Sequence, residues 1–153
     1  LKGDGFLSCS YQKILVPIDG SDSSYKAILE ATKIAKLSGG RIDLLHVVNL
    51  SEHVQIYSHF HEAYLPDHYV DEITNLGDEI IKTAMEEIPR ELQGIGKIES
   101  GDPRSILQQY VTTEPYDLVV IGCRGLGALP GLFMGSVSQF LVQNATCPVM
   151  VVK

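Results

Sequence analysis

The chain has 153 residues, of which 44% are hydrophobic and 20% are charged, and its formal net charge is −7. This length is typical of one domain that buries a core of its own. The negative charge argues against sequence-independent binding to nucleic acid, which requires clustered lysine and arginine. The apolar runs are far shorter than the roughly 20 residues of a membrane helix, and the start does not resemble a secretory signal. We therefore expect one soluble domain that binds neither nucleic acid nor a membrane.

Residues 1–12 carry little information, and we expect them to be a tail, native or left from cloning, so that the single domain spans residues 13–153. The three cysteines are an odd number without a C-x-x-C spacing: Cys9, Cys123 and Cys147. This pattern favours free thiols in a reducing compartment over a disulfide framework or a zinc site. The predicted location is the cytoplasm.

The first predicted elements are a strand, a helix and a second strand. The β-rich run KILVPID (13–19) ends in the cluster DGSDSS, in which Ser21 is placed to cap a helix. Apolar residues then recur at helical spacing until SGG, where Gly39 or Gly40 supplies the left-handed residue that ends the helix. The run RIDLLHVVN (41–49) predicts the second strand.

Residues 50–66 are polar and aromatic, without a clear period. We expect this segment to be a mobile loop that lies near a ligand as a lid, because it follows the second strand. Four histidines lie in it or beside it: His53, His59, His61 and His68. A metal or pH-sensing site stays open, although a solvated loop offers no firm scaffold for fixed ligands. We interpret His46 as a strand residue with a satisfied hydrogen bond.

A long helix and a third strand follow. The helix is predicted by an apolar stripe that Pro89 closes: Ile73, Leu76, Ile80, Ala84 and Ile88. The third strand lies within GIGKIES (94–100). The segment GDPRSILQQYV then starts a helix, with Asp102 as the N-cap and Pro103 at the first helical position, where a missing N–H costs nothing.

YDLVVIG (116–122) and CPVMVVK (147–153) are the last predicted strands, with a short helix around 137–141 between them. Strand and helix thus alternate five times, and strands rich in Val, Ile and Leu are typical of a parallel sheet covered on both faces. The predicted fold class is α/β, doubly wound. Ligands of such sheets bind outside the carboxyl ends of the strands, where the strand order reverses. If the first and fourth strands are neighbours there, Asp19 faces the loop after the fourth strand.

That loop contains five glycines: Gly122, Gly125, Gly127, Gly131 and Gly135. Glycine lets the backbone approach a ligand, and the N–H groups at the start of the next helix favour an anion such as phosphate. A P-loop is excluded because no lysine lies between Lys97 and Lys153. A dinucleotide fingerprint is excluded because it must follow the first strand. A long turn shaped by glycine alone stays open.

The segment GCRGLGALPGLFMGS (122–136) resembles the G-2x-G-9x-G-[ST] nucleotide-binding motif of the universal stress protein family. The resemblance extends over residues 13–153, through KILVPIDGSDSS, LLHVV, GDP and SVSQFLVQNATCPVMVVK. It implies a five-stranded parallel sheet in the order 3-2-1-4-5, with helices on both faces. It also implies that ATP, together with Mg²⁺, binds at the crevice beside the glycine loop.

The resemblance also implies the residues of the site. Phosphates would meet Gly125, Gly135, Ser136 and Val137, and Gly122 would approach the ribose. The adenine and ribose side would be lined by Pro17, Ile18, Asp19 and Ile42. Arg124 is either a fork donor to phosphate or a solvated loop residue, and Asp19 either contacts the ligand or Mg²⁺, or caps the first helix. Cys123 is interpreted as an inert small side chain, with redox sensitivity as the alternative.

These features favour a stress-response binding module that acts through its bound nucleotide or its dimer. The alternative is an enzyme, a slow ATP hydrolase or phosphotransferase at the same crevice. No base or nucleophile with a partner can be placed from the pattern alone, so we predict no catalytic residue. A scaffold without nucleotide is a third reading. The final strand is apolar and lies at a sheet edge in the implied order, which predicts a homodimer through that strand.

Overall fold

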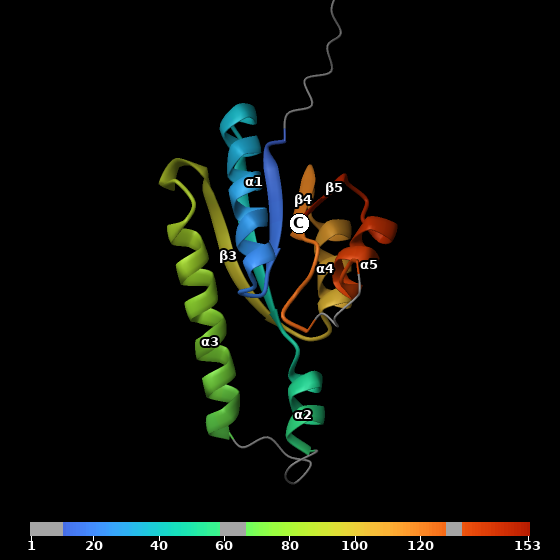
Figure 1. Cartoon of the computed structure of the whole chain (residues 1–153). Coiled ribbons are helices and arrows are strands. Elements are labelled where there is room, and N and C mark those ends of the chain that lie inside the picture. The colour runs from blue at the N-terminus through green and yellow to red at the C-terminus, as the bar shows by residue number, and fades with distance from the viewer. Residues whose placement is uncertain (1–10, 59–66, 128–132) are drawn as a thin grey trace, which may run out of the picture.

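The computed structural model describes residues 11–58, 67–127 and 133–153, which form a five-stranded parallel sheet with helices on both faces (Figure 1). Its strand order is β3-β2-β1-β4-β5. The strands are β1 (Lys13–Ile18), β2 (Arg41–Val48), β3 (Gln93–Ser100), β4 (Leu118–Gly122) and β5 (Val149–Val152). The predicted fold class and strand order are confirmed.

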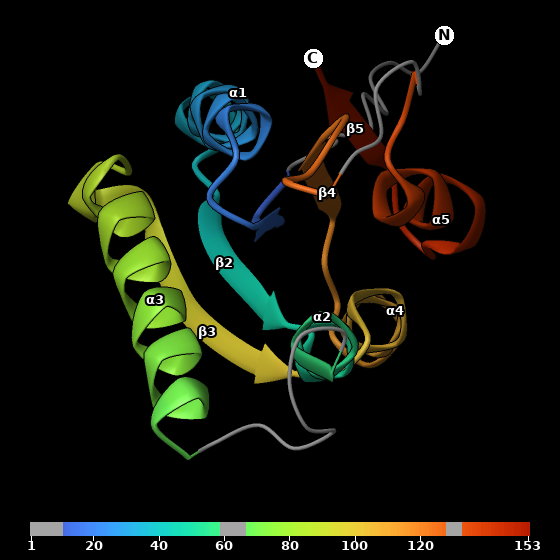
Figure 2. The same cartoon turned by 60° about the horizontal axis from the view of Figure 1, so that its bottom comes forward.

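The helices are α1 (Asp22–Ser38), α2 (Leu50–Ser58), α3 (Asp67–Glu86), α4 (Pro103–Thr113) and α5 (Ser136–Asn144), with a short 3-10 turn η1 (Arg90–Leu92). Except for α2, which lies beyond the carboxyl end of β2, the helices form layers on the two faces of the sheet (Figure 2). Helices α1 and α3 cover one face, and α4 and α5 cover the other. Within the described ranges, none of these helices has the length and apolarity that crossing a membrane requires.

Successive side chains of a strand point to opposite faces of the sheet, so the strands contribute to two hydrophobic cores, one on each face. Ile14 and Val16 of β1 pack beneath α1 and α3, whereas Leu15, between them, packs beneath α4 and α5. All three side chains are at most 1% exposed. Because both faces are covered, the strands are almost continuously apolar, which is the pattern that the sequence shows.

The helix ends form as the local sequence predicts. The Ser21 side chain caps α1, which ends at Gly39 in the left-handed conformation with φ 69°. Asp102 caps α4 by accepting the backbone N–H of Ser105 at 2.9 Å. That bond, together with one from the Ser105 hydroxyl, holds the pKa of Asp102 below its ordinary value.

The segment between β2 and α3 differs from the prediction. Residues 50–58 form helix α2, and its His53 ring lies edge-to-face against Tyr69 at the start of α3, with the ring centroids 6.1 Å apart. Nine residues are too few for a helical period to stand out from the sequence. The remainder of the predicted lid, including His59 and His61, lies outside the described residues.

Helix α3 begins at Asp67, six residues before Ile73, the first residue of the predicted apolar stripe. Leu76, which was predicted to belong to that stripe, is not buried. Its side chain is 57% exposed. The next residue, Gly77, takes the buried position, where a Cβ atom would lie 3.1 Å from Cδ2 of His46. The imidazole of His46 therefore occupies the space that a larger residue on α3 would fill.

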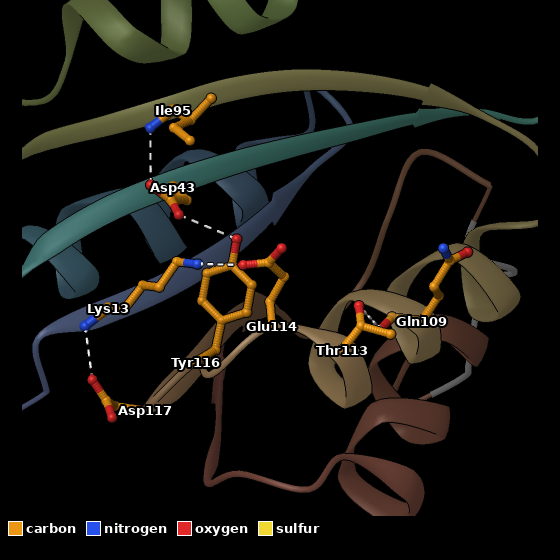
Figure 3. Close-up of polar contacts among 8 residues, drawn as sticks. All are labelled: Lys13, Asp43, Ile95, Gln109, Thr113, Glu114, Tyr116 and Asp117. Carbon is orange, nitrogen blue, oxygen red and sulfur yellow. Dashed lines mark hydrogen bonds and ion pairs between the residues drawn. The ribbon is translucent and has the colours of Figure 1, made fainter.

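A buried carboxylate lies inside the sheet at a bulge between β2 and β3 (Figure 3). Asp43 is 3% exposed and accepts hydrogen bonds from the Ile95 N–H at 2.8 Å and from the Tyr116 hydroxyl at 3.1 Å. Burial and the neighbouring Asp43 raise the pKa of Tyr116 well above its usual range, so its hydroxyl remains a donor. Lys13 lies over the Tyr116 ring, 4.4 Å from its centroid, and pairs with Glu114 at 2.7 Å.

Candidate functional site

The strand order reverses at β1, which pairs with β2 on one side and with β4 on the other. In an open parallel sheet, ligands bind beside such a reversal, outside the carboxyl ends of the strands. Two segments leave the sheet at this point. One is the turn from Asp19 into α1, and the other is the glycine-rich loop that begins after Gly122.

Asp19 lies directly against the glycine-rich loop, as the topology predicts. Its Oδ2 accepts the backbone N–H of Leu126 at 2.9 Å. Its Oδ1 accepts the N–H of Ser21 at 3.0 Å and the Ser21 hydroxyl at 2.6 Å. The carboxylate therefore joins Ser21, the N-cap residue of α1, to the loop. It does not cap the helix itself, and its contact with a ligand stays a prediction.

The amino terminus of α5 is the anion-favouring element of this edge. Helix α5 begins at Ser136, and no side chain caps it. Its first N–H groups have no partner within the helix and carry the positive end of the helix dipole. The hydroxyl of Ser138 is used internally, because it donates to the carbonyls of Cys123 at 3.1 Å and Gly135 at 2.9 Å. The exposed Ser136 is thus the hydroxyl that a ligand can reach.

Gly135, the N-cap residue of α5, is a glycine that neither backbone nor packing requires. Its φ of −72° and ψ of 157° are open to any residue. A Cβ atom there would lie 3.4 Å from the Cys123 carbonyl oxygen and 3.5 Å from Cα of Arg124, which are ordinary contacts. A side chain could therefore be accommodated at this position, and its absence leaves the backbone at the uncapped helix end uncovered by a Cβ atom. An N-terminus of this kind favours an anion such as phosphate.

The other predicted phosphate and base residues lie around the same edge. Arg124 is exposed, and its guanidinium has no ion pair with any residue that the structure describes. Pro17 and Ile18 are buried at the end of β1. The Ile18 carbonyl lies 2.9 Å from Nδ1 of His46, which confirms the satisfied hydrogen bond predicted for that histidine.

Ile42 is not brought to this edge, and we leave it out of the site. It stands at the amino end of β2, in register with Ile14, and it is fully buried in the core. The β2 residue that the sequence analysis missed is Val47. Leu45 pairs with Pro17, and Val47 follows it by two residues, so it shares that face of the sheet nearer the carboxyl end. It is half-buried. Strand alternation counted from the carboxyl end would have found it.

A metal site formed by protein side chains is not present in the described part of the chain. No group of three or more His, Cys, Asp or Glu side chains gathers there. His53, one of the four histidines of the predicted loop region, packs against an aromatic ring. Cys123 and Cys147 are free thiols.

Comparison with known proteins places these features in a family. The model of the Universal stress protein family matches residues 10–153. Universal stress protein YxiE of Bacillus subtilis is 33% identical over 148 residues, which cover 94% of this chain and 99% of that protein. Hypothetical protein MJ0577 has a solved structure that matches with a TM-score of 0.78 and 23% identity, over 94% of this chain and 96% of that chain.

Two further solved structures contain adenine nucleotides. The family protein At3g01520 of Arabidopsis thaliana, with AMP bound, has a TM-score of 0.61 and 25% identity, over 93% of this chain and 90% of that chain. The universal stress protein of Archaeoglobus fulgidus, in complex with dAMP, has a TM-score of 0.62 and 20% identity, over 94% and 99% of the two chains. The family model matches residues 10–153, and the sheet order is the one that the resemblance implied, so the chain belongs to the universal stress protein family.

Proposed function

We propose that this protein binds an adenine nucleotide, ATP with Mg²⁺, at the crevice between Asp19 and α5, and acts as a stress-response binding module. The observation that carries the proposal is the uncapped start of α5, preceded by Gly135, which neither its backbone conformation nor its packing requires. The nucleotide-bound family structures support the ligand class. Phosphate is the group that a helix N-terminus of this kind favours.

The described residues suggest how the ligand is held. Phosphate oxygens would accept hydrogen bonds from the N–H groups of Ser136 and Val137 and from the Ser136 hydroxyl, and the exposed guanidinium of Arg124 would donate two parallel hydrogen bonds to a phosphate. The base would lie over Pro17 and Val47, beside Ile18 at the end of β1. Asp19 would accept a ribose hydroxyl. Because a carboxylate repels a triphosphate, we propose that Mg²⁺ enters with ATP and offsets that repulsion.

Binding without efficient hydrolysis is the function that these side chains support. A general base must lie within hydrogen-bond reach of the attacking water. Among the described residues, Asp19 is the carboxylate that contacts the glycine-rich loop, and it already accepts bonds from Ser21 and Leu126. Its remaining lone pairs are the ones that we propose for the ribose hydroxyl, so they are not available to an attacking water. The Ser138 hydroxyl is directed to two carbonyls. We therefore place no residue of the described site in a catalytic role.

Nucleotide released from the purified protein tests the proposal. We expect mass spectrometry of the heat-denatured protein to detect an adenine nucleotide. We also expect isothermal titration of nucleotide-stripped protein to show tighter binding of ATP with Mg²⁺ than of GTP with Mg²⁺. If no nucleotide co-purifies and millimolar ATP produces no heat and no thermal shift, the crevice is a structural turn and the proposal is wrong.

We further propose a homodimer through β5. This strand is at the edge of the sheet, and Met150 on it is 39% exposed, so its outer backbone groups and side chains are open to pairing. A two-fold contact is the commonest way to cover such an edge. A cytoplasmic location stays a prediction, for which the free thiols of Cys123 and Cys147 are the support.

Met150→Lys is expected to convert the dimer to a monomer in light scattering at micromolar concentration, because the edge would gain a charge. This substitution is a better test than one at Val151, which packs against the core beneath α5. Val142→Lys is the matched control, since Val142 is 52% exposed on α5 and lies outside the edge strand. A monomeric parent protein would remove the dimer proposal.

A further inference from the structure

The first part of the glycine-rich loop is seated on the start of α1. The Ser23 hydroxyl donates a hydrogen bond to the carbonyl of Arg124, and the Ser21 hydroxyl lies 3.5 Å from the same oxygen. On the neighbouring side, Asp19 holds the N–H of Leu126 at 2.9 Å. Arg124 and Leu126 of the loop are thus both hydrogen-bonded to the segment between β1 and α1.

Two glycines of the family spacing are required by this seating. A Cβ atom at Gly122 would lie 2.5 Å from Oγ of Ser23 and 2.7 Å from its carbonyl carbon. A Cβ atom at Gly125 would lie 2.4 Å from Oδ2 of Asp19. Neither glycine is among those with a positive φ, so packing and not backbone conformation is the reason for glycine. At Gly122 the neighbours include backbone atoms of Ser23, which cannot move aside, whereas a side chain at Gly125 would displace the Asp19 carboxylate from its place against the loop. Gly135 differs, because its surroundings have room for a Cβ.

The seated stretch also fixes the start of α5. Cys123 precedes Arg124, and its N–H donates to the carbonyl of Val152 in β5 at 2.6 Å. Its carbonyl accepts the N–H of Gly135 at 2.7 Å and the Ser138 hydroxyl at 3.1 Å. A displacement of Arg124 away from α1 would therefore be transmitted through Cys123 to the N-terminus of α5.

We infer that the glycine spacing combines two functions: Gly122 and Gly125, together with Ser23, are positioning residues that seat the loop on α1, and Gly135 alone leaves space for the ligand. The binding half of this inference rests on the proposed nucleotide function. Ser23 is the new residue, since its hydroxyl is half-buried beneath the loop and acts on the phosphate site through Arg124 and Cys123.

Ser23→Ala tests the positioning role against a matched control, Ser38→Ala. Ser38 lies at the opposite end of α1, and its hydroxyl also donates to a backbone carbonyl, that of Tyr11, at 2.8 Å. We expect Ser23→Ala to raise the Kd for ATP with Mg²⁺ roughly tenfold, the effect of one lost hydrogen bond, and Ser38→Ala to leave it unchanged. Ser23→Thr, which keeps the hydroxyl, should restore most of the affinity.

Amide exchange without nucleotide separates this inference from the proposed function. In Ser23→Ala, but not in Ser38→Ala, the Gly135 N–H should exchange faster, because its acceptor Cys123 is no longer held in place. Equal exchange and equal Kd in the two variants would overturn the inference while nucleotide binding stands. If the parent binds no adenine nucleotide, the proposed function is wrong. The positioning role of Ser23 is then tested by the Gly135 exchange rates of Ser23→Ala and Ser38→Ala alone.

Alanine at the two kinds of glycine gives the second test. Gly122→Ala should lower the unfolding midpoint of the nucleotide-free protein, because Ser23 and the loop must separate. Gly135→Ala should leave that midpoint nearly unchanged and weaken ATP binding. If Gly122→Ala folds with the parent midpoint, or if Gly135→Ala destabilises the free protein as strongly, the division between the glycines is wrong.

Discussion

Gly135→Val is expected to abolish ATP binding and to leave the protein folded. Valine tolerates φ −72° and ψ 157°, which is extended backbone, and a Cβ meets only ordinary contacts here. Its two methyl groups would occupy the space over the first N–H groups of α5. We therefore expect at least a hundredfold rise in Kd, while the free protein loses about 1 kcal/mol or less through poorer helix capping.

Thermal denaturation with and without nucleotide measures this effect. At about one hundred times its Kd, a ligand that binds only the native state adds roughly 2.7 kcal/mol. For a domain of this size, that stabilisation raises Tm by roughly 5 to 10 °C. The parent should show this shift, and Gly135→Val should not. Ser136→Ala is the milder control, since it removes one hydroxyl and keeps the backbone donors. A full ATP shift in Gly135→Val would place the phosphates elsewhere.

Asp43→Ala is expected to cost about 3 kcal/mol of unfolding free energy, because the Ile95 N–H and the Tyr116 hydroxyl would both lose their buried acceptor. Figure 3 shows the carboxylate between these two donors. The carboxylate is packed against Gly94, where an added Cβ would overlap Oδ1 of Asp43. The loss should appear as a fall in the urea midpoint at unchanged slope.

Tyr116→Phe is the matched control for Asp43→Ala. It removes one donor but leaves the Asp43 carboxylate bonded to the Ile95 N–H, so we expect a smaller loss of about 1 kcal/mol. Nucleotide affinity should be unchanged in both variants, because the network lies away from the carboxyl ends of the strands. Equal losses in the two variants would show that the Ile95 bond contributes nothing.

The helix ends could be predicted because their chemistry is local. Ser21, Gly39 and Asp102 each act within a few residues of their own position, so a short stretch of sequence contains the whole interaction. The meeting of Asp19 with the glycine-rich loop could be predicted for another reason. A parallel sheet with one reversal of strand order brings the carboxyl ends of two strands together, whatever lies between them in the chain.

The rest depended on contacts that the sequence does not display. Ser23 and Arg124 are 101 residues apart, so no local pattern shows that Gly122 and Gly125 serve packing while Gly135 does not. Ile42 was assigned to the ligand through the family resemblance, and β2 has apolar residues near both of its ends, so the sequence did not reveal that Ile42 lies at the wrong end. Helix α2 was missed because nine residues contain little more than two turns.

Gly135 also sets a limit on how far this protein can be made thermostable without loss of function. Of the glycines whose surroundings the structure describes, it is the one where neither a positive φ nor a close neighbour forbids a side chain. Serine there would cap α5 and reduce the freedom of the unfolded chain, which together are worth about 1 kcal/mol. However, its hydroxyl would satisfy the same N–H groups that are proposed to hold phosphate. Stabilising this helix end and loading it with nucleotide are therefore competing uses of one set of donors.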